Sequence, residues 1–170
     1  MNPATGSLQV TTPGATDIVL TRDFATPRTL LFRALTEPHL LTRWYGARGW
    51  NLVECQIDLR VGGHRRLISR GPGGERMGQH GVHREVSPPE RLVYTERFDD
   101  QSYPGESLVT QVLIERAGRT TLTSTVRYAS PEARDTVLRY PMARGVAESY
   151  QRLDAVLAET AESTRQGEES

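Results

Sequence analysis

The order of apolar and polar positions along the chain predicts strands that are separated by short turns. In residues 17–24, Ile18 and Leu20 alternate with Val19 and Thr21, which is the two-residue period of a strand. Further segments rich in strand-forming residues are predicted at 51–59, 64–70, 77–86, 92–98, 107–116 and 119–128. Glycine and proline mark most of the intervals between these later strands, and short turns of this kind favour an antiparallel arrangement.

Two short helices are predicted between the first strand and the second. Thr26 and Pro27 suit the N-cap and the first position of a helix, because a hydroxyl can cap and proline fits the first turn. Pro38 begins a second helix that passes through Trp44, and Gly46 ends it. Both helices are too short to form a bundle by themselves.

A longer helix is predicted near the C-terminal end. Ser130 and Pro131 mark the start of a short helix over 132–139, and Pro141 separates it from a helix over 142–160. Apolar residues recur along this last helix at the helical spacing of about 3.6 residues. They are Met142, Val146, Tyr150, Leu153 and Leu157. This helix alone is long enough to cover one face of the sheet.

The elements together predict an α+β fold in which a curved antiparallel sheet wraps around a long C-terminal helix. We expect residues 1–16 to be a flexible tail, 17–160 to form a single domain and 161–170 to be a polar tail. A curved sheet cannot close tightly on one helix along its whole length. An internal cavity between the two is therefore expected.

Composition narrows the classes of function. The formal net charge is +0, which gives no overall attraction to nucleic acid, and no apolar run reaches the roughly 20 residues of a membrane helix. We therefore expect no nucleic-acid partner and no membrane insertion. All 21 basic residues are arginine, which excludes a Schiff-base lysine and a phosphate-loop lysine. Cys55 is the only cysteine, so an intrachain disulfide is excluded and a cytoplasmic location is expected.

Several short motifs stand in an order that resembles one known superfamily. They are FATPR at 24–28, EPHL at 37–40, RWYG at 43–46, DLRVGG at 58–63, PPERL at 88–92 and MARG at 142–145. The ordered set resembles the START-like superfamily, also called SRPBCC or the birch-pollen-allergen-like fold. Within it, the set is most similar to the AHSA-like branch, which is named after activators of a heat-shock-protein ATPase. The resemblance covers residues 17–158.

The resemblance implies a helix-grip fold with an internal ligand cavity and leaves three functions open. The first is the binding of a small hydrophobic or amphipathic ligand that carries a polar or anionic group. The second is a cyclase or hydrolase that uses His83 as a general base with Glu85 or Tyr94. The third is a module that regulates a chaperone in the stress response. A fold alone does not choose among them, and we favour ligand binding without catalysis.

Four polar residues stand where the resemblance or the strand pattern leads one to expect apolar or aromatic side chains. Arg65 replaces an aromatic residue of the family, His83 replaces a tyrosine, and Gln111 and Ser124 lie on apolar faces of their strands. We expect these four to line a pocket for a polar or anionic molecule, since a buried guanidinium needs an acceptor. Alternatively, Arg65 pairs with an internal carboxylate such as Glu85 or Glu96, or a bulge turns these side chains outward.

Other candidates for the ligand site are apolar or aromatic. Tyr45 and Trp44 are expected to form a lid over the cavity or to pack in the core, and Trp44 fits the core better. Met142, Val146 and Tyr150 are expected to line the cavity from the helix, where core and cavity wall are partly the same surface.

Metal and cofactor chemistry find little support in the sequence. His80 and His83 are three residues apart on a predicted strand, so they point to opposite faces. No metal site and no cofactor are expected, and the protein is expected to be a monomer or a homodimer.

Overall fold

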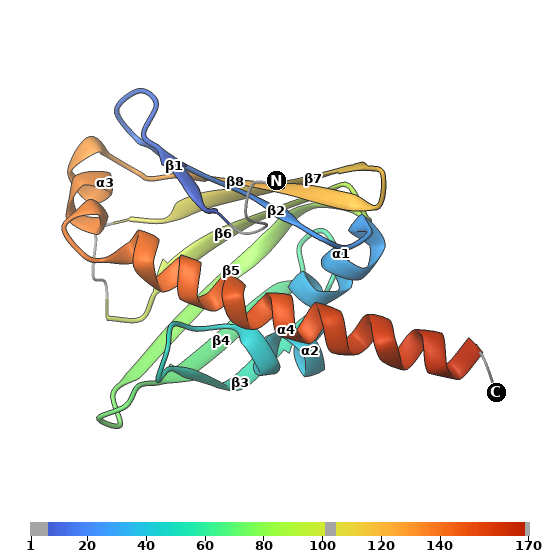
Figure 1. Cartoon of the computed structure of the whole chain (residues 1–170). Helices are drawn as coiled ribbons and strands as arrows, with labels where there is room; N and C mark the ends of the chain where they lie inside the picture. Colours follow the sequence, from blue (N-terminus) through green and yellow to red (C-terminus); the bar gives the residue numbers. More distant parts are fainter. Residues whose placement is uncertain (1–6, 101–104, 169–170) are drawn as a thin grey trace.

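A computed structural model describes residues 7–100 and 105–168 (Figure 1). The strands are β1 (Gln9–Thr11), β2 (Asp17–Phe24), β3 (Asn51–Ile57), β4 (His64–Arg70), β5 (Arg76–Ser87), β6 (Arg91–Phe98), β7 (Ser107–Arg116) and β8 (Arg119–Arg127). The helices are α1 (Arg28–Thr36), α2 (Pro38–Trp44), α3 (Pro131–Leu138) and α4 (Met142–Glu168).

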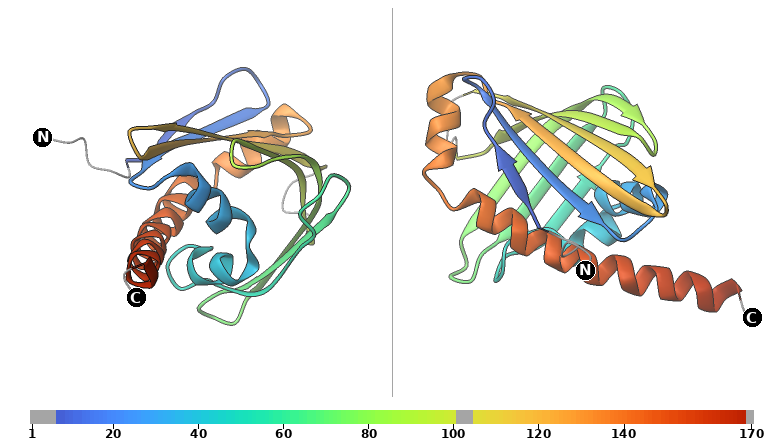
Figure 2. Two further views of the ribbon diagram at one scale, coloured as in Figure 1. Left: turned by 90° about the vertical axis from the view of Figure 1, so that its right-hand side faces the viewer. Right: turned by 45° about the horizontal axis from the view of Figure 1, so that its top comes forward.

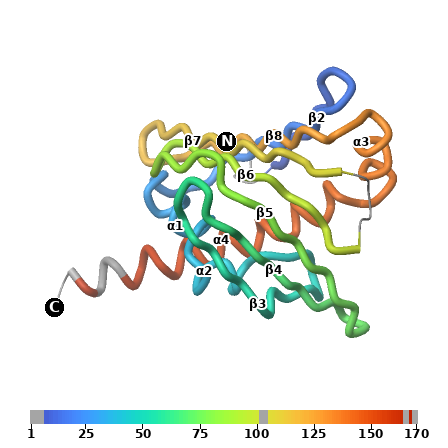
Figure 3. Tube along the Cα trace, turned by 180° about the vertical axis from the view of Figure 1, so that it is seen from behind, coloured from blue at the N-terminus to red at the C-terminus, as the bar shows by residue number. Residues whose placement is uncertain are grey.

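The strands form one eight-stranded antiparallel sheet in the order β1-β2-β8-β7-β6-β5-β4-β3. The sheet curves around α4, which is seen nearly end-on in the left view of Figure 2, with α1 and α2 beside it. Figure 3 gives the opposite side, where strands rather than helices lie in front. The predicted α+β helix-grip fold is therefore confirmed.

The alternation of side chains explains why the sheet has one apolar face. Along β2, Ile18, Leu20 and Phe24 are buried at every second position, while Val19 and Thr21 between them are less deeply buried. The inner faces of the strands pack on α1, α2 and α4 in one large core cluster. On α4, Tyr150, Leu153 and Leu157 of the predicted apolar stripe belong to this cluster.

Both predicted tails contain regular structure. The segment Gln9–Thr11 was expected to be flexible, but it pairs with β2 as strand β1. Residues 1–6 lie outside the described part of the chain. Helix α4 continues to Glu168, past the predicted end at residue 160, because the last residues are mostly good helix formers without proline. This end of α4 projects beyond the sheet (Figure 1).

Of the two predicted helix caps, Ser130 is confirmed and Thr26 is wrong. Ser130 caps α3, and its hydroxyl accepts a hydrogen bond of 3.1 Å from the amide of Ala133. Thr26 does not cap α1, because the N-cap is Pro27 and no side chain caps this end. Thr26 is buried instead, and its carbonyl accepts a hydrogen bond of 2.7 Å from the Thr120 hydroxyl. Thr26 therefore bonds to β8 through its backbone carbonyl, and its side chain does not cap α1.

An ion pair between the buried Arg22 and the partly exposed Asp154 joins α4 to the sheet. Arg22 lies on the inner face of β2 with 2% of its surface exposed, and its two terminal nitrogens bind the carboxylate of Asp154 at 2.8 and 2.5 Å. Its guanidinium also lies 4.5 Å from the ring centre of Phe24 and 5.9 Å from that of Tyr150. The charge of Arg22 is thus balanced within the protein.

Candidate ligand-binding site

Arg65 is the central residue of the candidate site. It lies on the inner face of β4, where Leu67 and Ser69 are also buried, and only 7% of its surface is exposed. The central carbon of its guanidinium lies 3.6 Å from the ring centre of Tyr94 on β6. The predicted inward orientation of Arg65 is what the structure has, and the charge rests against an aromatic face.

Gly81 on the intervening strand explains how Arg65 reaches Tyr94. In the register of β4 and β5, Arg65 pairs with Gly81, so no side chain at this position separates it from β6. A Cβ at Gly81 would lie 1.7 Å from the carbonyl oxygen of Thr95. Strands β5 and β6 therefore approach each other too closely here for any other residue.

Arg65 has no carboxylate partner of its own among the described residues. A bulge in β5 between His83 and Glu85 reverses the facing of the side chains that follow it. Val86 consequently packs on the core, and Glu85 forms an ion pair of 2.8 Å with Arg91. Glu85 therefore cannot be the internal partner that the alternative interpretation offered.

Glu96 is the other carboxylate that could have paired with Arg65, and it acts only at longer range. No ion pair within 4.0 Å joins the two in the described chain, although the positive charge of Arg65 lowers the pKa of Glu96. Burial has the larger effect and leaves the pKa of Glu96 above its ordinary value. The guanidinium is therefore buried with incomplete compensation of its charge.

Tyrosine and glutamine side chains complete the surroundings of Arg65. The hydroxyl of Tyr45, just after α2, exchanges hydrogen bonds of 2.8 and 3.1 Å with the amide of Gln79 on β5. Burial raises the pKa of Tyr94 to about 12, and burial likewise raises the pKa of the Tyr45 hydroxyl. Both tyrosines are therefore uncharged and can donate a hydrogen bond but cannot balance a positive charge.

His83 lies beneath the loop between β3 and β4 and is 1% exposed. Its Nδ1 is 3.1 Å from the carbonyl oxygen of Gly63, to which the protonated nitrogen can donate. Its Nε2 has no hydrogen-bond partner in the described part of the chain. Burial, followed by the charge of Arg65, lowers the pKa of the imidazole, so the neutral form is favoured.

The polar pair on β7 and β8 lies together but apart from Arg65. Gln111 donates a hydrogen bond of 3.4 Å to the hydroxyl of Ser124, its cross-strand neighbour. Ser124 in turn forms a hydrogen bond with Tyr150 of α4, which opposes the rise in pKa that burial causes for this tyrosine.

The remaining predicted residues have less direct roles. Trp44 is 3% exposed, and its indole nitrogen donates a hydrogen bond of 2.9 Å to the carbonyl of Ala34, as expected of a core residue. Val146 is half-buried against the main core cluster. Met142 packs instead on a second, smaller cluster around Ile18 and Tyr128.

Gln79 belongs to the candidate site, and the sequence analysis did not name it. It is 4% exposed and holds Tyr45, the predicted lid residue, at the inner face of the sheet. Alternation along β5 could have revealed it, because Gln79 and His83 are four residues apart and so share a face.

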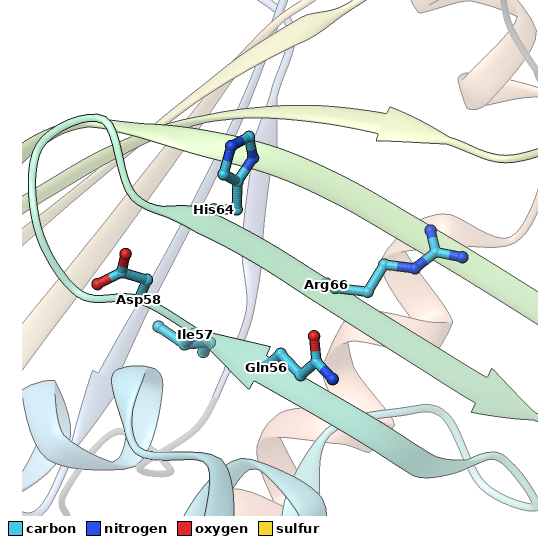
Figure 4. Close-up of a pocket in the computed structure, with 5 residues that line it drawn as sticks. All are labelled: Gln56, Ile57, Asp58, His64 and Arg66. Atoms are coloured by element: carbon cyan, nitrogen blue, oxygen red, sulfur yellow. The ribbon is translucent and has the colours of Figure 1, made fainter.

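Two pockets are open on the surface, and none of the predicted site residues lines them. The first has a volume of about 280 Å³ and is formed by Gln56, Ile57, Asp58, His64 and Arg66 at β3 and β4 (Figure 4). The second has a volume of about 360 Å³ and is formed by Asp23, Ile114, Arg116, Arg119 and Thr121. The polar group around Arg65 belongs to neither.

Comparison with known proteins decides the family. A profile described as Activator of Hsp90 ATPase homolog 1-like protein matches residues 25–158. The chain belongs to this family. The AHSA-like resemblance read from the sequence motifs is thereby confirmed. The family has ligand-binding and co-chaperone-like folds among its members, and the match names no ligand.

Solved structures agree with this assignment to the Activator of Hsp90 ATPase homolog 1-like family. A protein from Rhodobacter sphaeroides is 39% identical with a TM-score of 0.83, and the match covers 90% of this chain and 99% of that one. The AHSA1 protein from Silicibacter pomeroyi is 26% identical with a TM-score of 0.70, covering 85% and 99%. A Nitrosomonas europaea protein, 24% identical with a TM-score of 0.79, covers 88% and 99% and shows the fold alone. A comparison with curated proteins found no match.

Within residues 7–100 and 105–168, no helix combines the length and the apolar character that crossing a bilayer requires.

Proposed function

We propose that the protein binds a small molecule between the concave face of its sheet and α4, with the polar end of that molecule at Arg65. The observation that carries the proposal is the buried guanidinium of Arg65, which has no carboxylate within 4.0 Å in the described chain. Taking an ionised side chain out of water costs several kcal/mol unless a partner restores the lost interactions. A ligand with acceptor atoms would supply that partner.

Arg22 shows by contrast how this chain accommodates an arginine that serves structure. Its nitrogens hold the Asp154 carboxylate at 2.8 and 2.5 Å. Arg65 lies in the same interior and against a tyrosine ring at 3.6 Å, which offsets only part of the cost of burial. The difference between the two arginines supports a binding role for Arg65.

Tyr45 is the residue that we propose as the lid. It is half-buried, it follows α2 directly, and its hydroxyl is held by Gln79 beside the group around Arg65. Neither of the two surface pockets described above is lined by Tyr45 or Arg65, and a ligand would reach Arg65 by displacing Tyr45. The apolar part of the ligand would then contact Leu67 and Leu92, whose side chains belong to the main core cluster.

Native mass spectrometry of the freshly purified protein tests the proposal. We expect a small molecule to be released from the wild-type protein and from Arg84→Met, because Arg84 is exposed on β5. The molecule should be missing from Arg65→Met, which keeps the length of the side chain and removes its charge. A complete absence of any bound or bindable small molecule, together with co-purification of a chaperone, would favour the chaperone-regulating function instead.

Catalysis by His83 is a weaker proposal. Burial lowers the pKa of the imidazole and so favours its neutral form, and its Nε2 has no hydrogen-bond partner in the described part of the chain, as a general base requires. However, Glu85 is engaged by Arg91, and the ring centres of His83 and Tyr94 are 6.4 Å apart. Unchanged turnover of an identified ligand by His83→Gln would exclude this role.

A further inference from the structure

Building on the binding site proposed above, we infer that its ligand is a small organic acid with a single carboxylate, which Arg65 binds through two parallel hydrogen bonds. Arg65 selects the charge and shape of the ligand's polar end, whatever the chemistry of the apolar remainder. It follows from how the guanidinium is held and from the balance of charges around it.

The stacking of Arg65 on Tyr94 determines which acceptors fit. With its central carbon 3.6 Å from the ring centre, the guanidinium has one face covered by the tyrosine. Its N–H groups point outward in the plane of the guanidinium, so a partner must approach from the edge. A planar carboxylate offers two oxygens at the spacing of two such N–H groups, whereas a single hydroxyl can satisfy only one.

With Glu96 protonated, which its burial favours, the charges around Arg65 favour a ligand with a single negative charge. Arg22 is balanced by Asp154, which leaves the positive charge of Arg65 for the ligand. Glu96 lies near enough to interact with Arg65 and with both Tyr45 and Tyr94. A ligand with two negative charges, such as a phosphate monoester, would bring its second charge next to Glu96 without a cation to balance it.

Glu96 also couples binding to a proton. Burial already raises the pKa of Glu96, and a second anion at Arg65 would raise it further, because like charges repel. Binding of a carboxylate should therefore be accompanied by proton uptake at Glu96, and affinity should fall as the pH rises. The titratable and charged groups that interact with Glu96 or with Arg65 are Tyr45, Cys55, His83 and Tyr94, and Tyr150 lies beyond Tyr94.

Three probes with one apolar body and different polar ends test the inference. They are benzoate, benzyl alcohol and phenyl phosphate, titrated into the full chain by isothermal calorimetry. Wild-type protein and the surface control Arg84→Met should bind benzoate about 10- to 100-fold more tightly than either other probe, which is the range for hydrogen bonds to a charged group. Arg65→Met should lose this preference, and Arg65→Lys should keep only part of it, because lysine has the charge without the planar fork.

The pH dependence gives a second, independent readout. Between about pH 5 and pH 8, where benzoate stays ionised, wild-type affinity should fall with rising pH, and Glu96→Gln should remove most of that fall. Equal affinity of wild-type protein for benzoate and benzyl alcohol, or tighter binding of phenyl phosphate, would overturn the inference and leave ligand binding as such intact. If none of the probes binds and no compound co-purifies, the proposed function itself is wrong.

Discussion

Replacing Arg65 with methionine should make the protein more stable, although a buried contact is lost. Arg65 is 7% exposed and has no ion-pair partner within 4.0 Å in the described chain, so the folded state carries the desolvation cost of a charge. Methionine has a similar length, is flexible and apolar, and can fill the same space on β4. The substitution therefore removes the charge while preserving most of the packing.

The size of the gain follows from two opposing contributions. The effective penalty for burying an ion in a protein is several kcal/mol. The contact of the guanidinium with Tyr94 at 3.6 Å returns about 2 kcal/mol, the value for a desolvated cation–π interaction. The net effect of Arg65→Met is then a stabilisation of about 1–2 kcal/mol in the ligand-free protein.

Urea unfolding at neutral pH measures this effect. With a slope of about 2 kcal/mol per molar urea, the unfolding midpoint should rise by about 0.5–1 M in Arg65→Met. Arg84→Met, at an exposed position of β5, should stay within about 0.5 kcal/mol of wild type. A loss of more than about 1 kcal/mol in Arg65→Met would refute the reasoning. A double-mutant cycle with Glu96→Gln would then identify Glu96 as a structural partner, as the alternative interpretation of the sequence had it.

Three further results are expected from other parts of the molecule. Asp154→Asn should destabilise the protein by about 3 kcal/mol, because it leaves Arg22 buried without its carboxylate. Urea unfolding measures this change, and a loss below about 1 kcal/mol would contradict a role for the pair in holding α4 on the sheet. Because burial lowers the pKa of His83, the protein should lose stability as the pH falls below 6.5, the ordinary pKa of histidine. Thermal melts of His83→Gln should lack this loss. Identical pH profiles of the wild-type protein and His83→Gln would contradict this prediction. Gly81→Ala should lower the free energy of unfolding by about 3 kcal/mol or prevent folding, because the new Cβ would lie 1.7 Å from a backbone oxygen. Gly145→Ala in α4 should instead raise it by about 0.5–1 kcal/mol. Circular dichroism melts of the two glycine variants would show opposite shifts, and a neutral Gly81→Ala would disprove the close approach of the strands.

Much of the fold was predictable because local patterns and the final structure agree. The strands Asp17–Phe24, His64–Arg70 and Ser107–Arg116 have the predicted bounds, since alternation and turn residues both mark their ends. Strand β1 was missed because three residues are too few to establish a period. Its strand conformation comes from pairing with β2, which a local pattern does not contain.

For the candidate site, the sequence predicted which way the side chains face but not which residues they contact. Alternation correctly placed Arg65, His83, Gln111 and Ser124 toward the interior, since each strand is regular up to that residue. The partners of these side chains come from distant segments and could not be read from spacing. The bulge after His83 turns Glu85 away, and the Arg22–Asp154 pair joins residues 132 positions apart.

The two edge strands of the sheet affect how readily the protein aggregates at high concentration. An open sheet edge presents free backbone groups that can recruit strands from other molecules. Here one edge is β1, only three residues long, and the other is β3, whose pairing is interrupted by a bulge between Leu52 and Glu54. Short and irregular edges are poor templates for added strands, so this large sheet should resist edge-to-edge aggregation even though Val53 is 54% exposed beside the bulge.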